Sequence, residues 1–345
     1  MRVLMITCEW PTADRPFLAP FIVRQVAFLR KAGVEIDVFS FRGAQKPLNY
    51  LRAWAKVHQK LRRGSYDLVH AQWGQSAVTA LPTRLPLVVT FRGGEGEGII
   101  GSDGQYTTRG RALQVVGSLV ARRADELVLV SAHMEQFLPK RRAFHVVPSG
   151  LDFSRLPLIA QPEARQQLGL PPSKRLVLFV GDPDEARKRH GLARDIVSRL
   201  PPDLAADLVV AWDVPHDVVP VYMNACDALL FTSTYEGSPN VIKESLACNL
   251  PIVSTAVGDV PQRLKGVDGC VVCANADPKR MAEALATLLQ RRARTNGRET
   301  VLELDENRLA QRTIDIYQRA LSRTVHHRSQ HSTALERFGS DQGAR

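Results

Sequence analysis

Short apolar runs alternate with amphipathic helical patterns along most of this chain of 345 residues. Runs rich in Val, Ile and Leu are typical of strands that are buried on both faces of a parallel sheet. They fall at residues 2–7, 34–39, 67–73, 85–91, 126–131, 145–148, 175–181, 208–212, 228–231 and 251–255. Helices are predicted between or after them, at residues 21–32, 109–123, 277–289 and 308–321. This alternation predicts an α/β protein with doubly wound, Rossmann-like parallel sheets.

A change in composition divides this pattern into two parts. Residues 157–172 are rich in Pro and Gln and predict a linker. A chain of this length can form two α/β domains. We therefore expect domains at residues 1–156 and 157–305, with a last helix at 306–322. Residues 323–345 are rich in Ser, His, Gln and Gly, which predicts a disordered tail.

The composition is ordinary for a globular protein, with 44% hydrophobic residues. No apolar run reaches the roughly 18 residues that a membrane-spanning helix needs. Glu9 follows the first apolar run too soon for a signal peptide, so a cytoplasmic location is expected. The five cysteines fit free thiols in a reducing compartment. Cys270 and Cys273 have a spacing that metal and redox sites also use, but no second pair or histidine lies near them.

The net charge of +11 lies almost entirely in the first half of the chain. Residues 1–160 hold 22 Lys and Arg against 12 Asp and Glu, whereas residues 161–345 hold 24 against 23. The first half is therefore expected to meet an anionic partner: a membrane surface, an anionic lipid-linked acceptor or a nucleic acid. Nucleic acid is disfavoured, because the basic residues are not interleaved with exposed aromatic residues and no recognition motif is present.

One helical pattern in the basic half, at residues 46–63, is a candidate for membrane contact. Leu51, Trp54, Ala55 and Leu61 share a helical face, and six Lys or Arg surround them. This combination is typical of an interfacial helix on an anionic membrane. The alternative is a surface helix that packs its apolar stripe on the domain and turns its basic face to water.

The strongest candidate for chemistry is the segment from Tyr235 to Glu244, which follows a short apolar strand. Ser238 is a good N-cap, and Pro239 suits the first position of a helix. The N–H groups of residues 238–241 then face outward at the positive end of the helix, where a phosphate can bind.

The segment also carries two carboxylates, Glu236 and Glu244. Because carboxylates repel a phosphate, we expect them to accept hydrogen bonds from hydroxyl groups, as in a sugar nucleotide. The alternative is that both are solvated surface charges.

Glu236 and Glu244, with the Leu-Ala-Cys-Asn-Leu-Pro-Ile-Val run at 246–253 and Gly-Asp-Val at 258–260, resemble the Glu-x7-Glu region of family-four retaining glycosyltransferases. The sequence Ser-Pro-Asn-Val-Ile-Lys-Glu at 238–244 resembles that of the family branch that builds cell-surface polysaccharides. The resemblance covers roughly residues 1 to 321. It implies the GT-B fold: a domain for the acceptor, a facing domain for the nucleotide sugar, and a last helix that crosses back to the first domain.

The resemblance also implies roles for individual residues. Glu244 corresponds to the residue that binds the ribose hydroxyls, and Glu236 to one that binds a hydroxyl of the donor sugar. Lys188 matches the family's diphosphate-binding lysine, and Arg92 stands at the sugar end of the crevice. Further donor contacts are expected from Gly181, Ser238, Asn240, Val241 and, near the base, Val214.

Three positions depart from the family pattern. Asp182 replaces the arginine of the phosphate clamp, and Arg187 or Arg189 can compensate. The triple-basic run at 187–189 is otherwise a solvated helix start. Arg92 replaces the usual histidine; it fits an anionic donor sugar such as a uronic acid, or a plain surface ion pair. Ala19-Pro20 stand where glycines often let the backbone approach the donor.

The expected activity is retaining, hexosyltransferase-type transfer without an enzymatic nucleophile, in which the leaving phosphate helps to deprotonate the acceptor. No metal or other cofactor is expected for this activity. The alternatives are a sugar-nucleotide epimerase of the same fold and a degenerate, non-catalytic sugar-nucleotide-binding protein. A dinucleotide dehydrogenase is disfavoured, because no Gly-x-Gly-x-x-Gly follows the first strand.

Overall fold

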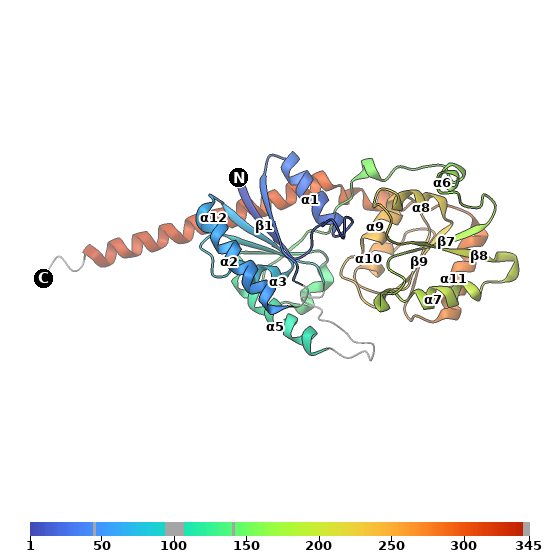
Figure 1. The fold of residues 1–345 in the computed structure, drawn as a ribbon, viewed down its shortest axis with the longest axis horizontal. Coiled ribbons are helices and arrows are strands. Elements are labelled where there is room, and N and C mark those ends of the chain that lie inside the picture. The colour runs from blue at the N-terminus through green and yellow to red at the C-terminus, as the bar shows by residue number, and fades with distance from the viewer. Residues whose placement is uncertain (44–45, 94–106, 140–141, 341–345) are drawn as a thin grey trace.

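The computed structural model describes residues 1–43, 46–93, 107–139 and 142–340, and the side chains up to residue 323. Two α/β domains lie side by side, and the long helix α12 runs from their junction along the first domain and past it (Figure 1). No helix of the described segments is both long and apolar enough to span a bilayer.

The first domain contains a six-stranded, all-parallel sheet in the order β2-β1-β3-β4-β5-β6. Its strands are β1 (Arg2–Thr7), β2 (Glu35–Ser40), β3 (Leu68–Gln72), β4 (Leu87–Phe91), β5 (Glu126–Leu129) and β6 (His145–Val146). Its helices are α1 (Pro20–Lys31), α2 (Pro47–Arg63), α3 (Gly74–Ala77), α5 (Thr108–Arg123) and the 3₁₀ turns η1 (Val78–Ala80), η2 (Ala132–Phe137) and η3 (Phe153–Arg155). Separate apolar clusters cover the two faces of this sheet.

The second domain contains a five-stranded parallel sheet in the order β11-β10-β9-β7-β8. Its strands are β7 (Arg175–Val180), β8 (Ala206–Ala211), β9 (Ala228–Phe231), β10 (Ile252–Thr255) and β11 (Cys270–Cys273). Its helices are α6 (Gln161–Leu168), α7 (His190–Ser198), α8 (Val219–Ala225), α9 (Asn240–Ala247), α10 (Val260–Leu264), α11 (Pro278–Arg291) and the 3₁₀ turns η4 (Ala186–Lys188), η5 (Pro202–Leu204) and η6 (Glu299–Leu304). The predicted pair of doubly wound parallel sheets is confirmed.

The residues predicted as a linker, 157–172, instead contain helix α6, which packs on α8. The buried Arg165 explains this packing: its guanidinium donates to the Ala225 carbonyl at 2.9 Å and to Asp227 at 3.0 Å. Side-chain hydrogen bonds of this kind were not visible in the Pro- and Gln-rich composition.

The last helix, α12 (Glu306–Ser340), is longer than the predicted helix at 306–322. The sequence from 323 to 338 contains neither Pro nor Gly, so nothing in it breaks a helix. Residues 341–345 of the predicted tail lie outside the described residues.

The first half of α12 packs on the first domain together with α1. Tyr317 is fully buried, and its hydroxyl lies 2.7 Å from Nδ1 of His70 on β3, whose Nε2 lies 2.8 Å from the Thr90 hydroxyl. Complete burial lowers the pKa of His70 to about 3, so this histidine is a neutral bridge between β4 and α12. The chain thus ends on the domain in which it begins.

Helix α2 matches the predicted helix at 46–63, but its packed face differs from the predicted one. Ala53 and Val57 are buried and Leu61 packs on the core. Leu48 and Leu51 are 65% and 62% exposed. The helix therefore buries one apolar stripe and leaves a second one in solvent.

Candidate active site

The facing ends of the two sheets meet through loops that follow β4 and β9. A Cβ atom on Gly237, in the loop after β9, would lie 2.6 Å from the carbonyl oxygen of Arg92, in the loop after β4. Only glycine permits this approach, because the clash would be with main-chain atoms on both sides. Gly93, at φ +147°, faces the Gly237 backbone. The crevice predicted at the carboxyl ends of the strands is thus closed on one side by backbone contact between the domains.

Glu236 lies at the centre of a compact basic cluster. Its Oε1 lies 2.7 Å from Nζ of Lys188 and accepts a 3.1 Å hydrogen bond from the Ser233 hydroxyl. It also forms an ion pair with Arg187. Burial tends to raise the pKa of Glu236, but Lys188 and Arg187 outweigh it and hold the pKa below its ordinary value. Glu236 is therefore ionised at neutral pH.

The charged residues of the loop after β7 take distinct positions. Lys188 lies at the end of η4, and its aliphatic stem packs 3.4 Å from where a Cβ of Gly181 would lie. Asp182 accepts from the Asp184 N–H at 2.9 Å and so caps its own turn. Arg189 donates to the carbonyls of Thr232 and Ser233, at 2.6 and 3.1 Å, and so holds the loop after β9. Of the two arginines considered for the missing clamp position, Arg187 points to Glu236.

Glu244, on helix α9, is 5% exposed and lies 3.3 Å from Nε2 of His216, in the loop after β8. Burial tends to raise its pKa, but His216 outweighs it, so the pKa of Glu244 lies below its ordinary value. Val214, in the same loop as His216, packs its side chain against the apolar core of the second domain. Glu244, the residue predicted to bind the ribose, thus joins helix α9 to the loop after β8.

The start of α9 differs from the prediction by one residue. Pro239, not Ser238, is the N-cap, and no side chain caps the helix. The Ser238 hydroxyl instead donates to Asp259 at 2.8 Å, because that carboxylate lies directly across the turn. Asn240 and Val241 form the first turn, and the buried Oδ1 of Asn240 has no hydrogen-bond partner within the described part of the chain.

Arg92 is held by side chains of the first domain and of the interdomain connection. Its Nε donates to Gln72 at 2.9 Å, Nη1 to the Ser149 hydroxyl at 2.9 Å and Nη2 to Gln25 at 3.2 Å. The guanidinium also lies over the ring of Phe21. Each of its three nitrogens thus donates to a neutral side chain. The Gly-Glu-Gly segment at 94–98 lies outside the described residues.

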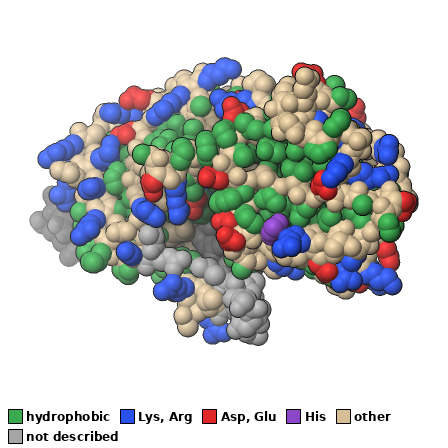
Figure 2. Space-filling model, turned by 45° about the vertical axis from the view of Figure 1, so that its right-hand side comes forward, with side chains coloured by type: hydrophobic (Ala, Val, Ile, Leu, Met, Phe, Trp, Pro, Cys, Tyr) green, Lys and Arg blue, Asp and Glu red, His purple; other side chains and the backbone are tan. Residues whose placement is uncertain are grey.

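A cavity of about 950 Å³ opens in the first domain beside the crevice. It lies among the loops after β1 and β2, the start of α2 and helix α5, and its lining includes Glu9, Trp10, Arg15, Arg42, Tyr50 and Arg109. Burial raises the pKa of Glu9, which Arg92 and Arg15 oppose. Ala19, at φ 50°, ends the loop after β1 and leads into Pro20, the first residue of α1. Figure 2 shows a hollow in one face of the molecule, with acidic and basic side chains on its rim.

Sequence patterns did not single out several residues of this region. His216, Ser233 and Lys243 were read only as parts of loops or of the motif, and Glu306 only as a helix start. Lys243 and Glu306 are both buried, at 1% and 2% exposed. Their burial was not readable from the sequence, because lysine and glutamate are rarely buried in proteins.

Two family models match the chain, one for each domain. Residues 2–150 match the "Glycosyl transferase 4-like domain", and residues 160–291 match "Glycosyl transferases group 1". Among curated proteins, the chain is 26% identical to the putative teichuronic acid biosynthesis glycosyltransferase TuaC of Bacillus subtilis, over 75% of this chain and 82% of TuaC. It is 28% identical to D-inositol 3-phosphate glycosyltransferase 1 of Catenulispora acidiphila, over 67% of this chain and 66% of that protein.

Solved structures share the fold at low sequence identity. Sucrose-phosphate synthase from Thermosynechococcus elongatus aligns over 93% of this chain and 99% of its own, with a TM-score of 0.77 and 17% identity. Anabaena HepE in complex with UDP-glucose aligns over 95% of this chain and 100% of its own, with a TM-score of 0.65 and 17% identity. The two-domain arrangement predicted from the sequence is thus that of known glycosyltransferase structures.

Proposed function

The chain belongs to the family-four glycosyltransferases of the GT-B fold, and from this premise we propose that it transfers a sugar, with retention, from a nucleotide sugar to a glycan or lipid-linked acceptor in cell-surface polysaccharide synthesis. Similarity to TuaC, described as a teichuronic acid biosynthesis protein, supports the polysaccharide role. Likeness to HepE in complex with UDP-glucose supports a nucleotide-sugar donor. The reaction is hexosyltransferase-type.

One observation carries this proposal: three loops of the second domain bring together, at the crevice, groups suited to bind a phosphate and carboxylates suited to bind hydroxyl groups. Lys188 and the first turn of α9 offer positive charge, whereas Glu236 and Glu244 are carboxylates with lowered pKa values. A nucleotide sugar contains both a diphosphate and hydroxyl-rich sugars, so it fits this division better than an inorganic anion does.

The proposed donor contacts follow from these charges. Lys188 neutralises the diphosphate as negative charge develops on the leaving group, and the N–H groups of Asn240 and Val241 add the helix-dipole contribution. Glu244 accepts hydrogen bonds from the ribose hydroxyls. Gly181, at φ +135°, lets the backbone turn close to the diphosphate, and the backbone near Val214 meets the base.

Glu236 is proposed to exchange partners when the donor binds. Its carboxylate pairs with Lys188 and Arg187 in this structure. A diphosphate that draws Lys188 away leaves Glu236 available for a hydroxyl of the donor sugar. Arg187 remains to balance the charge of Glu236, which limits the repulsion between this carboxylate and the phosphates.

Retention is proposed to proceed on one face of the sugar, with the leaving phosphate accepting the acceptor's proton. No side chain is assigned as nucleophile. The absence of a metal requirement stays a prediction: transfer should persist when EDTA is present. Arg92 is proposed to supply positive charge at the sugar end of the crevice while Gln72, Gln25 and Ser149 orient it. An anionic donor sugar suits that charge.

The acceptor is proposed to enter from the first domain, which carries the excess positive charge and the 950 Å³ cavity. Helix α2, whose exposed Leu48 and Leu51 lie among Lys and Arg residues, is proposed to contact an anionic membrane. A position at the cytoplasmic face of the membrane follows from that contact, since lipid-linked acceptors reside there.

The donor is tested by thermal-shift measurements with a panel of UDP-, GDP- and ADP-sugars, followed by product analysis with the stabilising donor. One donor is expected to raise the melting temperature, as mass action requires of a ligand that binds the native state. Transfer to an acceptor, rather than interconversion of the free sugar nucleotide, distinguishes the proposal from epimerisation. If no nucleotide sugar shifts the melting temperature, the proposal fails.

A further inference from the structure

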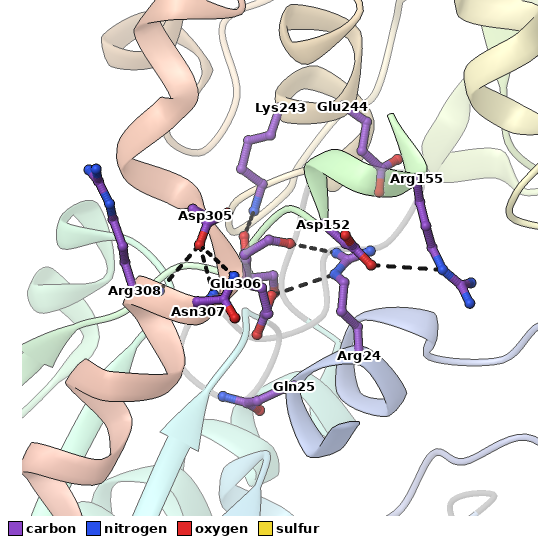
Figure 3. A network of polar contacts seen from close by, with 12 residues as sticks. Arg24, Gln25, Asp152, Arg155, Lys243, Glu244, Asp305, Glu306, Asn307 and Arg308 are labelled. Carbon is purple, nitrogen blue, oxygen red and sulfur yellow. Dashed lines mark hydrogen bonds and ion pairs between the residues drawn. The ribbon is translucent and has the colours of Figure 1, made fainter. Parts of the chain in front are cut away.

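Lys243 is a buried lysine at the junction of the two domains. It precedes Glu244 on helix α9 and is 1% exposed. Its Nζ donates to the main-chain carbonyl oxygen of Ser149 at 3.2 Å, and Ser149 lies in the connection that leads out of β6 (Figure 3). Because burying an ammonium group costs free energy, a solvent-facing lysine or an apolar residue would be the cheaper choice for stability. The hydrogen bond from Lys243 to Ser149 joins helix α9, which also carries the proposed ribose-binding residue Glu244, to the interdomain connection.

Ser149 links both domains through different atoms. Its hydroxyl accepts from Nη1 of Arg92 in the first domain at 2.9 Å, while its carbonyl accepts from Lys243 in the second. The next carbonyl, that of Gly150, accepts from Nη2 of Arg24 at 2.6 Å. Arg24 in turn lies 3.5 Å from Glu306 at the start of α12. Figure 3 shows Lys243 and Arg24 pointing toward the same short stretch of chain, beside Glu306.

The two chain crossings between the domains are also tied to each other. The Leu151 N–H donates to the Leu304 carbonyl at 2.7 Å, and the Glu306 N–H donates to the Leu151 carbonyl at 2.9 Å. The outgoing connection and the returning segment therefore form one short bridge. A rigid-body movement of one domain against the other must change torsions here, and Lys243 contacts this point from the second domain.

Charged groups from four elements face Lys243. They are Glu244 on α9, Asp259 and Arg263 at and within α10, Arg24 on α1 and Glu306 on α12. Burial lowers the pKa of Lys243 to about 7; Asp259 opposes this and Arg263 adds to it. The amine thus gains and loses its proton near neutral pH. Either form can donate to the Ser149 carbonyl, but the charged form makes the stronger hydrogen bond.

We propose that Lys243 is a positioning residue that holds helix α9 against the Ser149 carbonyl and so sets the spacing of the two domains for transfer. The inference rests on the proposed function, because a donor on the second domain must meet an acceptor on the first. Small errors in such an alignment are costly: a displacement of about 1 Å can lower a rate on the order of a hundredfold.

The test compares Lys243→Met, which keeps the length of the stem without the amine, with Lys265→Met, an exposed control in the same domain. Lys243→Met is expected to lower kcat about tenfold while the Kd for the nucleotide changes less than about twofold, because the nucleotide ligands lie within the second domain. Lys265→Met should match the wild type. Unchanged kcat in Lys243→Met, or equal losses in kcat and nucleotide affinity, would overturn the inference.

Stability separates positioning from a purely structural role. The lowered pKa means that burying the charged amine costs stability below about pH 7, and that this cost declines as pH rises toward the ordinary lysine value. Lys243→Met removes the cost, so at pH 6 it should melt no lower than the wild type while its turnover falls. If the melting temperature and kcat fall together, Lys243 has a structural role only.

Two further measurements address the positioning role, and the first of them needs no turnover. Small-angle scattering of the unliganded proteins should give a larger radius of gyration for Lys243→Met than for the wild type; identical scattering curves contradict the inference even if no donor is found. In wild type, kcat should fall as pH rises through about 7, an inflection that Lys243→Met lacks. A wild type that binds no nucleotide sugar refutes the proposed function, whereas the scattering comparison still decides the role of Lys243.

Discussion

The two sides of the crevice present their chemistry in different ways. In the second domain, Lys188, Glu236 and Glu244 lie in loops and a helix that follow strands β7 and β9. Lys188 pairs with Glu236, and Glu244 lies beside His216. In the first domain, the cavity is lined by loops and helices from residue 8 to residue 116, and Arg92 is bound by neutral side chains. The proposed donor side is thus formed by a few neighbouring loops, whereas the proposed acceptor side is assembled from distant parts of the chain.

This difference indicates where each kind of specificity resides. A nucleotide diphosphate is a constant ligand, so a short strand-turn-helix unit can carry its recognition from one protein to another. An acceptor varies between pathways, so its binding surface depends on loops that can change without disturbing the sheet. The first domain also carries almost all of the excess positive charge.

Removal of the proposed phosphate-binding lysine should have the largest effect on this comparison. Lys188→Ala is expected to lower kcat by about a hundredfold or more, the magnitude typical of losing one preorganised contact to developing charge. Steady-state kinetics with the identified donor measure it, with the exposed Lys279→Ala as control. Full activity of Lys188→Ala would contradict the assignment of the donor site to the loops of the second domain.

A substitution at Gly237, where the two domains contact each other, tests whether transfer requires that contact. In Gly237→Ala, the new Cβ would lie 2.6 Å from the Arg92 carbonyl, so the domains must separate slightly. We expect kcat to fall at least about tenfold, by the same alignment argument, with nucleotide affinity nearly unchanged. Kinetics and nucleotide titration measure the split. Gly191→Ala is the control, because this glycine also lacks a positive φ and has open space where the Cβ would lie; equal effects of the two changes would contradict the contact argument.

The ionic cluster of the donor side should make stability depend on pH. The pKa of Glu236 lies below its ordinary value in the folded state, so its ionised form stabilises the protein above about pH 4.5. That stability is lost as pH falls through the folded-state pKa. Glu236→Gln should therefore lower the melting temperature at pH 7 by several degrees and narrow the gap to the wild type at pH 3 to 4. A gap that stays constant over this range would show that the pairing with Lys188 and Arg187 contributes no pH-dependent stability.

The smallest expected effect concerns the outer surface of the first domain. Leu51→Glu should weaken sedimentation with vesicles that contain anionic lipid by severalfold, because it places a carboxylate on the exposed apolar stripe of α2. Leu302→Glu, an exposed leucine of the second domain at 48% exposure, is the matched control. If both variants sediment as the wild type does, α2 is a plain surface helix, as the alternative interpretation holds.

The fold was readable from the sequence because its strands are buried on both faces and so appear as apolar runs. The donor motif was readable for a related reason: Glu236, Ser238 and Glu244 belong to one contiguous segment. Lys188 follows β7, the strand that pairs with β9 in the sheet. The local errors of the sequence prediction arose where a side chain contacts residues that are distant in the sequence. Asp259 accepts from the Ser238 hydroxyl that was expected to cap α9, and Arg165 attaches helix α6, in the predicted linker, to the end of α8.

By itself, then, the sequence determined two parallel-sheet domains, the family, and the basic character of the first domain, since these depend on periodicity, contiguous motifs and charge counts. Only the tertiary structure decided which partners those charges have. It placed His216 beside Glu244, bound Arg92 to Gln25, Gln72 and Ser149, and buried Lys243 against the interdomain connection. The physical reason is that hydrogen bonds and ion pairs act over about 3 Å, while the residues that form them are far apart along the chain and meet only after both sheets have folded and packed.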